Sequence, residues 1–371
     1  MTVGIYTIHA CCNFGALLQA YATARFITEN GHQAEIVNLM TKSNEDAINY
    51  RWPWKNLKGI LYNIYALLNP AVHKKVRHYK EFRKLLPLSK RYYSKEEIIN
   101  NPPCYDIHLV GSDQVWNTEN GLKDSFYYLP FLPTKALRIS YASSFGNIDS
   151  AKRYQTQIIS LLSKFAHRSV REQDAANYLT NECHLPTNCV LDPTFLLSSH
   201  QWDEISGSSP LIEGKYILYY GFDNNKTYSE ILQVVRNTLK IPLVGVSVSL
   251  HSPYKFDKFY QSAGPIEFLN LIKNATFIVT SSFHGMALAI NFHKDFIVLK
   301  HGTRMSRIES LLKMIKLENR IVNNINRTTN IIKNNRFIDY ELTNSERLKI
   351  INESKQWLIN SINNIYIKRE D

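Results

Sequence analysis

Short apolar runs alternate with longer segments of helical periodicity along most of the chain. The runs that predict buried strands lie at residues 3–8, 34–39, 106–110, 138–142, 216–220, 243–248, 277–279 and 296–299. Segments with the apolar spacing of helices lie at residues 16–29, 150–165, 173–179, 228–239, 286–290 and 305–315. Strands that alternate with helices are typical of parallel sheets, so the pattern predicts an α/β protein.

The pattern stops once and then restarts, which indicates two domains. Residues 198–214 are rich in Ser, Gly and Pro and predict a linker, and 371 residues exceed one ordinary core. We expect an N-terminal Rossmann-like domain over residues 1–200 and a C-terminal one over residues 215–330. A helical segment at 331–371 is expected to cross back to the first domain. Two Rossmann-like domains around a cleft are the architecture of a B-type glycosyltransferase (GT-B).

The strand at 277–279 ends in a turn rich in hydroxyl residues, and Ser282, His284 and Gly285 lie there, just before an apolar helix. Free N–H groups and the dipole at a helix start attract anions, and histidine can donate to a phosphate or carboxylate. Lys300 and Arg304 follow the next apolar run. This unit predicts half of an anionic-substrate site. The alternative is an ordinary helix start that contains Ser and His.

The loop after the first strand is expected at the same cleft, because ligands of such sheets bind beyond the carboxyl ends of strands. Asn13, Gly15 and Gln19 lie in this loop and in the helix that follows it. The loop has neither GxGxxG nor a Walker A pattern, which argues against a dinucleotide or a P-loop nucleotide.

Polar residues also follow the strand at 106–110, where Ser112, Asp113, Gln114 and Trp116 lie close together. Asp113 can accept a proton or bind a hydroxyl. Because Ser and Asp are also common helix caps, a capping role for Asp113 is the competing interpretation.

Two further candidates follow later strands of the N-terminal domain. Ser144 comes after the strand at 138–142, and Arg171 lies at a junction between a short strand and a helix. An arginine in this place can clamp a carboxylate through two hydrogen bonds. It can equally pair with Glu172 or Asp174 at the surface.

The formal net charge of +12 leaves nucleic acid, an anionic membrane or small acidic substrates as partners. No zinc spacing, RNP-type pattern or lysine-rich tail indicates nucleic acid, so we expect none to bind. The charge is densest at residues 73–95, which read as a helix. Such a helix faces either an anionic membrane, as an interfacial element, or water, as an ordinary solvated surface.

Cysteine use and hydropathy indicate the compartment. The five cysteines form no CxxC pair, so neither a disulfide framework nor a zinc site is indicated. No signal-peptide pattern and no run of about 18 apolar residues occurs. We expect a cytoplasmic protein in peripheral contact with the inner membrane face.

Six short motifs resemble the polysaccharide pyruvyltransferase family. They are NFGALLQAYA at 13–22, VGSDQVWN at 110–117, ISYASSFG at 139–146, SVRE at 169–172, LDPT at 191–194 and SSFHG at 281–285, in the order of the family. The resemblance implies a GT-B-like fold. It also implies transfer of pyruvate from phosphoenolpyruvate, as a ketal, to a sugar of a cell-surface polysaccharide or its lipid-linked precursor. Phosphoenolpyruvate is then the donor substrate, and no further cofactor and no metal are expected.

The resemblance also suggests roles for individual residues. The arginine and histidine of the family look like Arg171 and His284, and its later basic residue, often lysine, falls on Arg304, with Lys300 as a competitor. Our hypothesis is that Arg171 and Arg304 hold the anionic groups of the donor while His284 bonds the phosphate and supplies the proton. Asp113 then orients or deprotonates the acceptor hydroxyl on the N-terminal side. A nucleotide-sugar glycosyltransferase and a catalytically silent sugar-binding protein are the alternatives.

Overall fold

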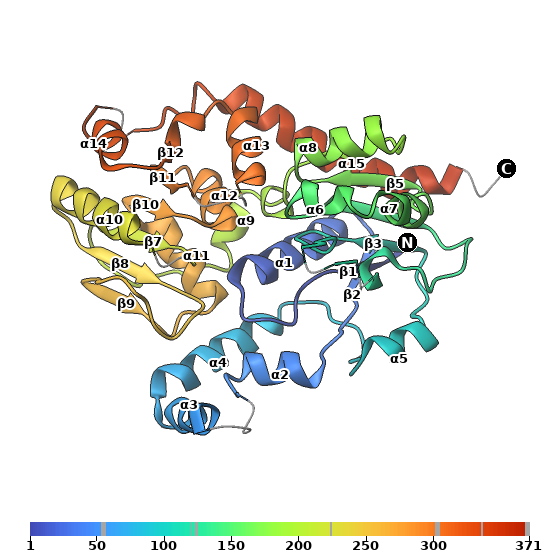
Figure 1. Ribbon diagram of the computed structural model, residues 1–371, viewed down its shortest axis with the longest axis horizontal. Coiled ribbons are helices and arrows are strands. Elements are labelled where there is room, and N and C mark those ends of the chain that lie inside the picture. The colour runs from blue at the N-terminus through green and yellow to red at the C-terminus, as the bar shows by residue number, and fades with distance from the viewer. Residues whose placement is uncertain are drawn as a thin grey trace.

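The computed structural model describes residues 1–52, 57–119, 121–122, 125–222, 225–300, 305–334 and 337–367. Each half of the chain is built around one parallel sheet of six strands (Figure 1). The predicted alternation of strands and helices is therefore confirmed, and with it the α/β class.

The N-terminal sheet has the strand order β2-β1-β3-β4-β5-β6. Its strands are β1 (Thr2–Tyr6), β2 (Gln33–Ile36), β3 (Ile107–Val110), β4 (Arg138–Ser143), β5 (His167–Val170) and β6 (Asn188–Cys189). The helices of this half are α1 (Phe14–Glu29), α2 (Lys42–Ile48), α3 (Leu57–Leu68), α4 (Pro70–Arg83), α5 (Lys95–Asn100), α6 (Ile148–Lys152), α7 (Gln155–Leu162), α8 (Gln173–Asn177) and α9 (Ser199–Asp203). The strand order reverses between β1 and β3, and the carboxyl ends of these strands are where such a sheet binds its ligand.

The C-terminal sheet has the order β12-β11-β10-β7-β8-β9 and reverses between β7 and β10. Its strands are β7 (Ile217–Tyr220), β8 (Leu243–Val246), β9 (Lys258–Tyr260), β10 (Phe277–Thr280), β11 (Phe296–Leu299) and β12 (Ile321–Val322). The helices are α10 (Lys226–Leu239), α11 (Pro265–Asn274), α12 (Phe283–Asn291), α13 (Ser306–Met314), α14 (Ile325–Asn334) and α15 (Asn344–Ile367). Both halves thus have a reversal point suited to a ligand.

The two halves share one apolar core rather than meeting through a free linker. The ring of Phe14 on α1 stacks on Phe268 of α11 with centroids 4.7 Å apart. The predicted linker at 198–214 begins with α9, where Trp202 is fully buried and donates to the carbonyl of Thr194 at 3.0 Å. The linker expectation was wrong for this part, because Ser and Gly mark helix caps and turns as readily as free segments.

Helix α15 runs from the C-terminal half across the N-terminal half (Figure 1). There the Ser354 hydroxyl accepts from the backbone N–H of Leu191 at 3.0 Å, and Trp357 lies against Tyr141. Among the described residues, no helix is both long and apolar enough to pass through a bilayer.

The sequence suggested one helix over the basic segment at 73–95, and the structure shows that this was wrong. Helix α4 ends at Arg83, and Lys75 is buried, with its ammonium donating to the carbonyl of Ser247 at 2.7 Å. Burial lowers the pKa of Lys75 to about 7. The segment therefore divides into an inward face bound to the C-terminal half and an outward basic face.

Candidate active site

A pocket of about 540 Å³ lies where the reversal points of the two sheets meet. It is lined by Ile8, Cys11, Asn13, Ala16, Asp113, Gln114, Phe222, Ser281, Ser282, Phe283, His284 and Arg307. These residues lie in the loops after β1, β3, β7 and β10, except for Ala16 in α1, Phe283 and His284 in the first turn of α12, and Arg307 in α13. The pocket thus takes its walls from both halves of the chain.

Arg171 lies beneath the pocket in a cluster of three carboxylates. It follows the carboxyl end of β5, and its side chain is 1% exposed. Its Nη1 donates to Asp192 Oδ2 at 2.6 Å, and Asp113 and Glu172 each have a carboxylate oxygen 3.6 Å from the guanidinium. Burial by itself would lower the pKa of Arg171, but these carboxylates raise it above its ordinary value. The arginine is therefore a fixed cation.

Asp192 connects this cluster to the C-terminal half. Its Oδ1 accepts from the backbone N–H and the hydroxyl of Thr194, at 3.0 and 2.9 Å. Its Oδ2 lies 3.6 Å from His284 Nε2. Burial would raise the pKa of the Asp192 carboxyl, but His284, Arg171 and the Thr194 N–H together hold it well below its usual range. Asp192 is therefore an anion that accepts a hydrogen bond from Arg171 and lies beside His284, whose Nε2 has no hydrogen-bond partner among the described residues.

His284 lies in the first turn of α12, as the sequence pattern predicts for an anion site. Ser282 is the N-cap of this helix, and its hydroxyl accepts from the backbone N–H of Gly285 at 3.3 Å. The imidazole ring of His284 packs on Gly15 of α1. The histidine is thus held between helices from the two halves.

Substitution of Gly15 by alanine is expected to displace His284 and lower turnover. A methyl group at this position would overlap the imidazole ring, so the side chain of His284 or the helices that hold it must shift. A misplaced catalytic group costs on the order of a hundredfold in rate. Steady-state kinetics of the variant measure the loss.

Gly31→Ala is the matched control. Gly31 has a φ of +85° and open space around it, so alanine strains the backbone without touching the site. We expect both variants to melt at a lower temperature and only Gly15→Ala to lose turnover. Equal kinetic effects of the two substitutions would show that Gly15 has no special relation to His284.

Arg307, on α13, lines the pocket with its guanidinium. The Cζ atoms of Arg171 and Arg307 lie 4.5 and 5.8 Å from the centroid of the Phe283 ring. The Nε of Arg307 has no hydrogen-bond partner among the described residues. Burial, and then the charge of Arg171, lower the pKa of Arg307 to about 10. A bound anion would relieve this repulsion and complete the hydrogen bonds of Arg307.

Asn13, Asp113 and Gln114 line the pocket from the N-terminal half. Asn13 also caps α1, since its Oδ1 accepts from Ala16 N at 3.2 Å. Asp113 has a left-handed backbone with φ of 72°, and its Oδ1 accepts from the N–H of Gln114 at 2.9 Å. Asp113 therefore combines the two interpretations of the sequence, a local cap and a carboxylate at the cleft.

Several predicted ligand-binding residues lie behind the pocket wall instead. Gln19 is buried, donates to the Thr7 hydroxyl at 2.8 Å and accepts from the N–H of Ser112 at 3.1 Å. Ser144 is buried and donates to Glu172 at 2.6 Å. These side chains hold the loops after β1, β3 and β4 together. Their expected contact with substrate is corrected to a positioning role.

The expected contact with substrate is corrected in the same way for Trp116, Ser112 and Gly285. Trp116 is 1% exposed, stacks on Tyr128 with centroids 5.5 Å apart and belongs to the apolar core. Ser112 is fully buried and donates to the carbonyl of Ala142 at 2.8 Å. Gly285 lies in the first turn of α12 against Thr280. A polar cluster after a strand predicts the cleft but not which side chains face it.

Of the two basic candidates after β11, only Lys300 lies within the described residues, and it does not line the pocket. Lys300 is exposed, with its ammonium 3.9 Å from a Glu309 carboxylate oxygen. Arg304 lies outside the described residues.

Sequence reasoning missed Asp192, Arg307 and Ser281. The hydroxyl of Ser281 is buried without a hydrogen-bond partner among the described residues and lines the pocket. Asp192 lies within the LDPT motif, and its place after an apolar pair was a usable signal. Arg307 lies within an ordinary amphipathic helix, where no local pattern distinguishes it.

Solved structures with the same architecture are UDP-N-acetylglucosamine 2-epimerases. A putative enzyme of this kind from Listeria monocytogenes is 10% identical, with 99% of this chain and 97% of that chain covered and a TM-score of 0.56. The enzyme from Neisseria meningitidis, bound to UDP-GlcNAc, is 12% identical, with coverages of 97% and 99% and a TM-score of 0.53. The enzyme from Methanocaldococcus jannaschii is 12% identical, with coverages of 91% and 94% and a TM-score of 0.51. These similarities confirm the GT-B-type architecture.

Sequence comparison adds one match and one absence. A family model described as "Polysaccharide pyruvyl transferase" matches residues 13–303. No curated protein is similar to the chain. The matched range contains every pocket-lining residue except Ile8, Cys11 and Arg307.

Proposed function

The chain belongs to the polysaccharide pyruvyl transferase family, and we propose from this premise that it transfers pyruvate from phosphoenolpyruvate to a sugar as a ketal. The acceptor is a sugar of a cell-surface polysaccharide or of its lipid-linked precursor. The proposal rests on one observation above others: the half-buried guanidinium of Arg307 lines a pocket built largely from family motifs, and the buried guanidinium of Arg171 lies behind it against the same Phe283 ring.

Phosphoenolpyruvate has a phosphate and a carboxylate, and the pocket lining has one guanidinium, that of Arg307, together with polar donors. Arg307 has an unpartnered Nε, and Ser281 has an unpartnered hydroxyl, among the described residues. The first turn of α12 adds backbone N–H groups and the positive end of the helix dipole. In the proposal Arg307 joins the residues that hold the donor, and the role assigned to Arg304 stays a prediction.

The proposed reaction begins with a proton delivered from His284 to the methylene carbon of the donor. The resulting cationic carbon C2 is attacked by one sugar hydroxyl, the bond from C2 to the phosphate oxygen breaks, and a second hydroxyl adds. The two sugar hydroxyls release two protons. One restores the proton that His284 gave to the new methyl group, and the other leaves with phosphate. Asp192, 3.6 Å from His284 Nε2, stabilises the protonated imidazole before transfer.

Asp113 is suited to the acceptor side of this reaction. It lies on the N-terminal wall of the pocket, and its side chain is 15% exposed. In the proposal it accepts the proton of the attacking hydroxyl.

The decisive assay supplies phosphoenolpyruvate labelled in its pyruvyl carbons together with a panel of lipid-linked sugars. The proposal expects label in an acid-labile ketal and release of one phosphate for each pyruvyl group transferred. Absence of transfer to every acceptor, with phosphoenolpyruvate bound, would favour the silent sugar-binding protein.

A nucleotide-sugar glycosyltransferase is the second candidate, since the fold is shared with an epimerase bound to UDP-GlcNAc. Thermal shift separates the two. Phosphoenolpyruvate is expected to raise the melting temperature, and UDP-sugars are expected to leave it unchanged. The opposite result would replace the proposal with the glycosyltransferase.

Substitution of Arg307 by glutamine is expected to raise the KM for phosphoenolpyruvate about 10- to 100-fold, because a hydrogen bond to a charged group is worth about 1.5–3 kcal/mol. The melting temperature should hold or rise, since the variant removes a repelled buried charge. Lys313→Gln, an exposed position on the same helix, is the control. An unchanged KM in Arg307→Gln would remove Arg307 from the donor site.

A further inference from the structure

Helix α3 turns its apolar side to solvent. Leu57, Leu61, Ile64 and Leu68 recur at helical spacing, and their exposed fractions are 70, 57, 44 and 74%. Trp52, just before this helix, is 56% exposed. Large apolar side chains gathered on one exposed face are unusual in a soluble protein and mark a surface that binds something.

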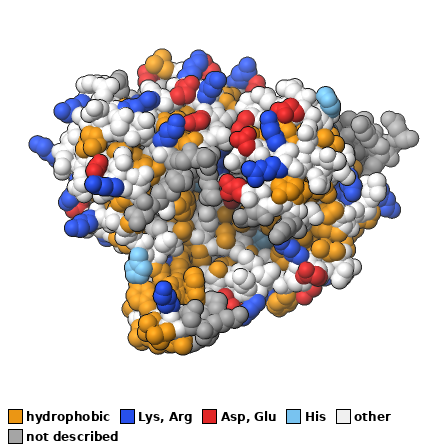
Figure 2. All heavy atoms as spheres, in the orientation of Figure 1, with side chains coloured by type: hydrophobic (Ala, Val, Ile, Leu, Met, Phe, Trp, Pro, Cys, Tyr) orange, Lys and Arg blue, Asp and Glu red, His pale blue; other side chains and the backbone are white. Residues whose placement is uncertain are grey.

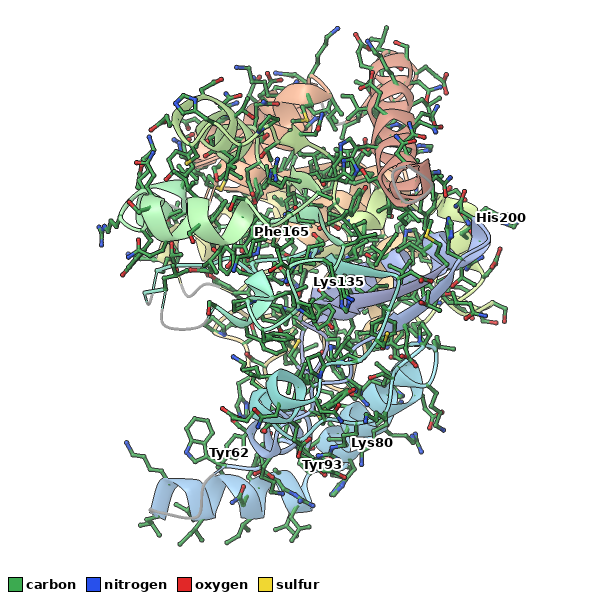
Figure 3. The ribbon with its side chains drawn as sticks, turned by 90° about the vertical axis from the view of Figure 1, so that its right-hand side faces the viewer. Tyr62, Lys80, Tyr93, Lys135, Phe165 and His200 are labelled. Carbon is green, nitrogen blue, oxygen red and sulfur yellow. The ribbon has the colours of Figure 1, made fainter. Side chains whose placement is uncertain are left out.

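The opposite side of α3, which faces the protein, has small and polar residues. Its buried positions are Gly59, Asn63 and Ala66. Asn63 accepts from the backbone N–H of Trp52 and donates to its carbonyl, both at 2.8 Å. Figure 3 shows α3 at the end of the molecule, with Tyr62 directed back to the body and other side chains directed away. A helix that packs on a core normally has the reverse arrangement.

Cations surround this apolar face. Residues 57–83 contain six lysines and arginines, of which Lys75 is buried and Arg83 donates to the carbonyl of His9 at 2.9 Å, and Glu81 is the single acidic residue. Lys74, Arg77 and Lys80 are exposed on α4, whereas Glu81 is bonded to Lys84 at 2.8 Å. The α3–α4 surface is therefore cationic as well as apolar.

A groove of about 500 Å³ brings the two kinds of side chain together. Ile64 and Leu67 of α3 line the same groove as His73, Arg77 and Lys80 of α4. In Figure 2 hydrophobic side chains gather at the lower end of the molecule, where Figure 1 places α3. Apolar and cationic groups thus share one continuous surface.

We propose that this α3–α4 surface docks on an anionic lipid bilayer, with the leucine face of α3 in the headgroup boundary and the α4 cations on lipid phosphates. An apolar stripe bordered by lysine and arginine is what an anionic membrane surface attracts. A second copy of the chain fits less well, because a symmetric contact would bring the same cations face to face.

The α3–α4 surface and the active-site pocket contact two adjacent residues of the same loop. Cys12 packs against the cluster of Tyr50, Ala66 and Val72 beneath α3 and α4, and its neighbour Cys11 lines the active-site pocket. If the proposed function holds, docking brings the pocket to an acceptor on a lipid carrier. Binding to the bilayer does not depend on that reaction.

Flotation of the full chain with vesicles tests the proposal without any substrate. We expect binding to phosphatidylcholine vesicles that contain phosphatidylglycerol, weaker binding at high salt, and little binding to phosphatidylcholine alone. Serine at Leu61, Ile64 and Leu68 together should weaken binding about a hundredfold. Glutamine at Lys74, Arg77 and Lys80 should do the same, since each cation near such a surface contributes about fivefold.

Matched controls change the same residue types elsewhere on the surface. One is serine at the exposed positions Leu211, Leu342 and Leu348. The other is glutamine at the exposed positions Lys164, Lys215 and Lys226. Both control variants should bind like the native chain.

Two results would overturn the proposal. The first concerns vesicles: either the α3 serine variant binds them as well as the native chain does, or the native chain does not bind them at all. The other is a dimer in solution that the same variant dissociates, because it would assign the face to a second copy. Transfer activity on a water-soluble acceptor, measured in parallel, reports on the proposed function alone. Failure of vesicle binding therefore leaves the transfer assay interpretable, and failure of transfer leaves vesicle binding interpretable.

Discussion

Replacement of Arg171 by glutamine is expected to abolish transfer and to destabilise the protein at the same time. The guanidinium is 1% exposed and faces Asp113, Glu172 and Asp192. Its removal leaves buried carboxylates without a cation, and breaking a buried ion pair costs about 3–5 kcal/mol of unfolding free energy. The sequence alone suggested only that Arg171 binds an anionic group or pairs with Glu172 or Asp174. The burial of Arg171 predicts both effects.

Denaturant unfolding and the labelled-donor assay measure the two effects separately. The double variant Arg171→Gln, Asp192→Asn is the informative control, because removal of both charges should restore much of the stability. It should restore no activity, since the site then lacks its fixed cation and the anion beside His284. A single variant as stable as the native chain would contradict the ion-pair argument. Native turnover would remove Arg171 from the site.

Replacement of His284 by glutamine is expected to lower turnover by about 10²–10⁴, the usual contribution of a general acid. The side-chain amide of glutamine retains a hydrogen-bond donor, but it is not an acid and cannot deliver a proton to the donor substrate. We therefore expect the KM for phosphoenolpyruvate to change far less than kcat. The position of the imidazole, 3.6 Å from Asp192 Oδ2 and against Gly15, is the structural basis.

His200→Gln, at an exposed position on α9, controls for loss of a histidine as such. Thermal shift with phosphoenolpyruvate shows whether the donor still binds the His284 variant. If kcat stays within about threefold of native while KM rises, His284 holds the phosphate and another group delivers the proton. If neither constant changes, the histidine has no part in the reaction.

The elements of the fold could be predicted because each depends on residues close together in the chain. The apolar run of β10 and the apolar helix α12 lie side by side in sequence and were expected, whereas the helix begins three residues earlier than predicted and its cap at Ser282 was not predicted. Strand and helix periodicity also indicated two halves. The family resemblance indicated the GT-B architecture, which the solved structures confirm.

The position of the site could be predicted only as a set of loops. Ligands of parallel sheets bind at the carboxyl ends of strands, and this rule selected the loops that contain Asn13, Asp113 and His284. It did not say which side chains turn into the pocket. Gln19, Ser144 and Trp116 belong to the same loops or their neighbours but point into the interior.

Sequence by itself determined the class of the protein, the alternation of its main strands and helices and the strand ends at which chemistry is placed, because local periodicity acts over a few residues, although it did not reveal the short strands β9 and β12. Only the tertiary structure decided that Arg171 neutralises Asp113, Glu172 and Asp192 in one buried cluster, that Arg307 faces the pocket, and that α3 turns its leucines outward. Each of these depends on which distant strand ends and helix faces the topology brings together. The charge and burial of a side chain depend on those neighbours, and sequence spacing does not encode them.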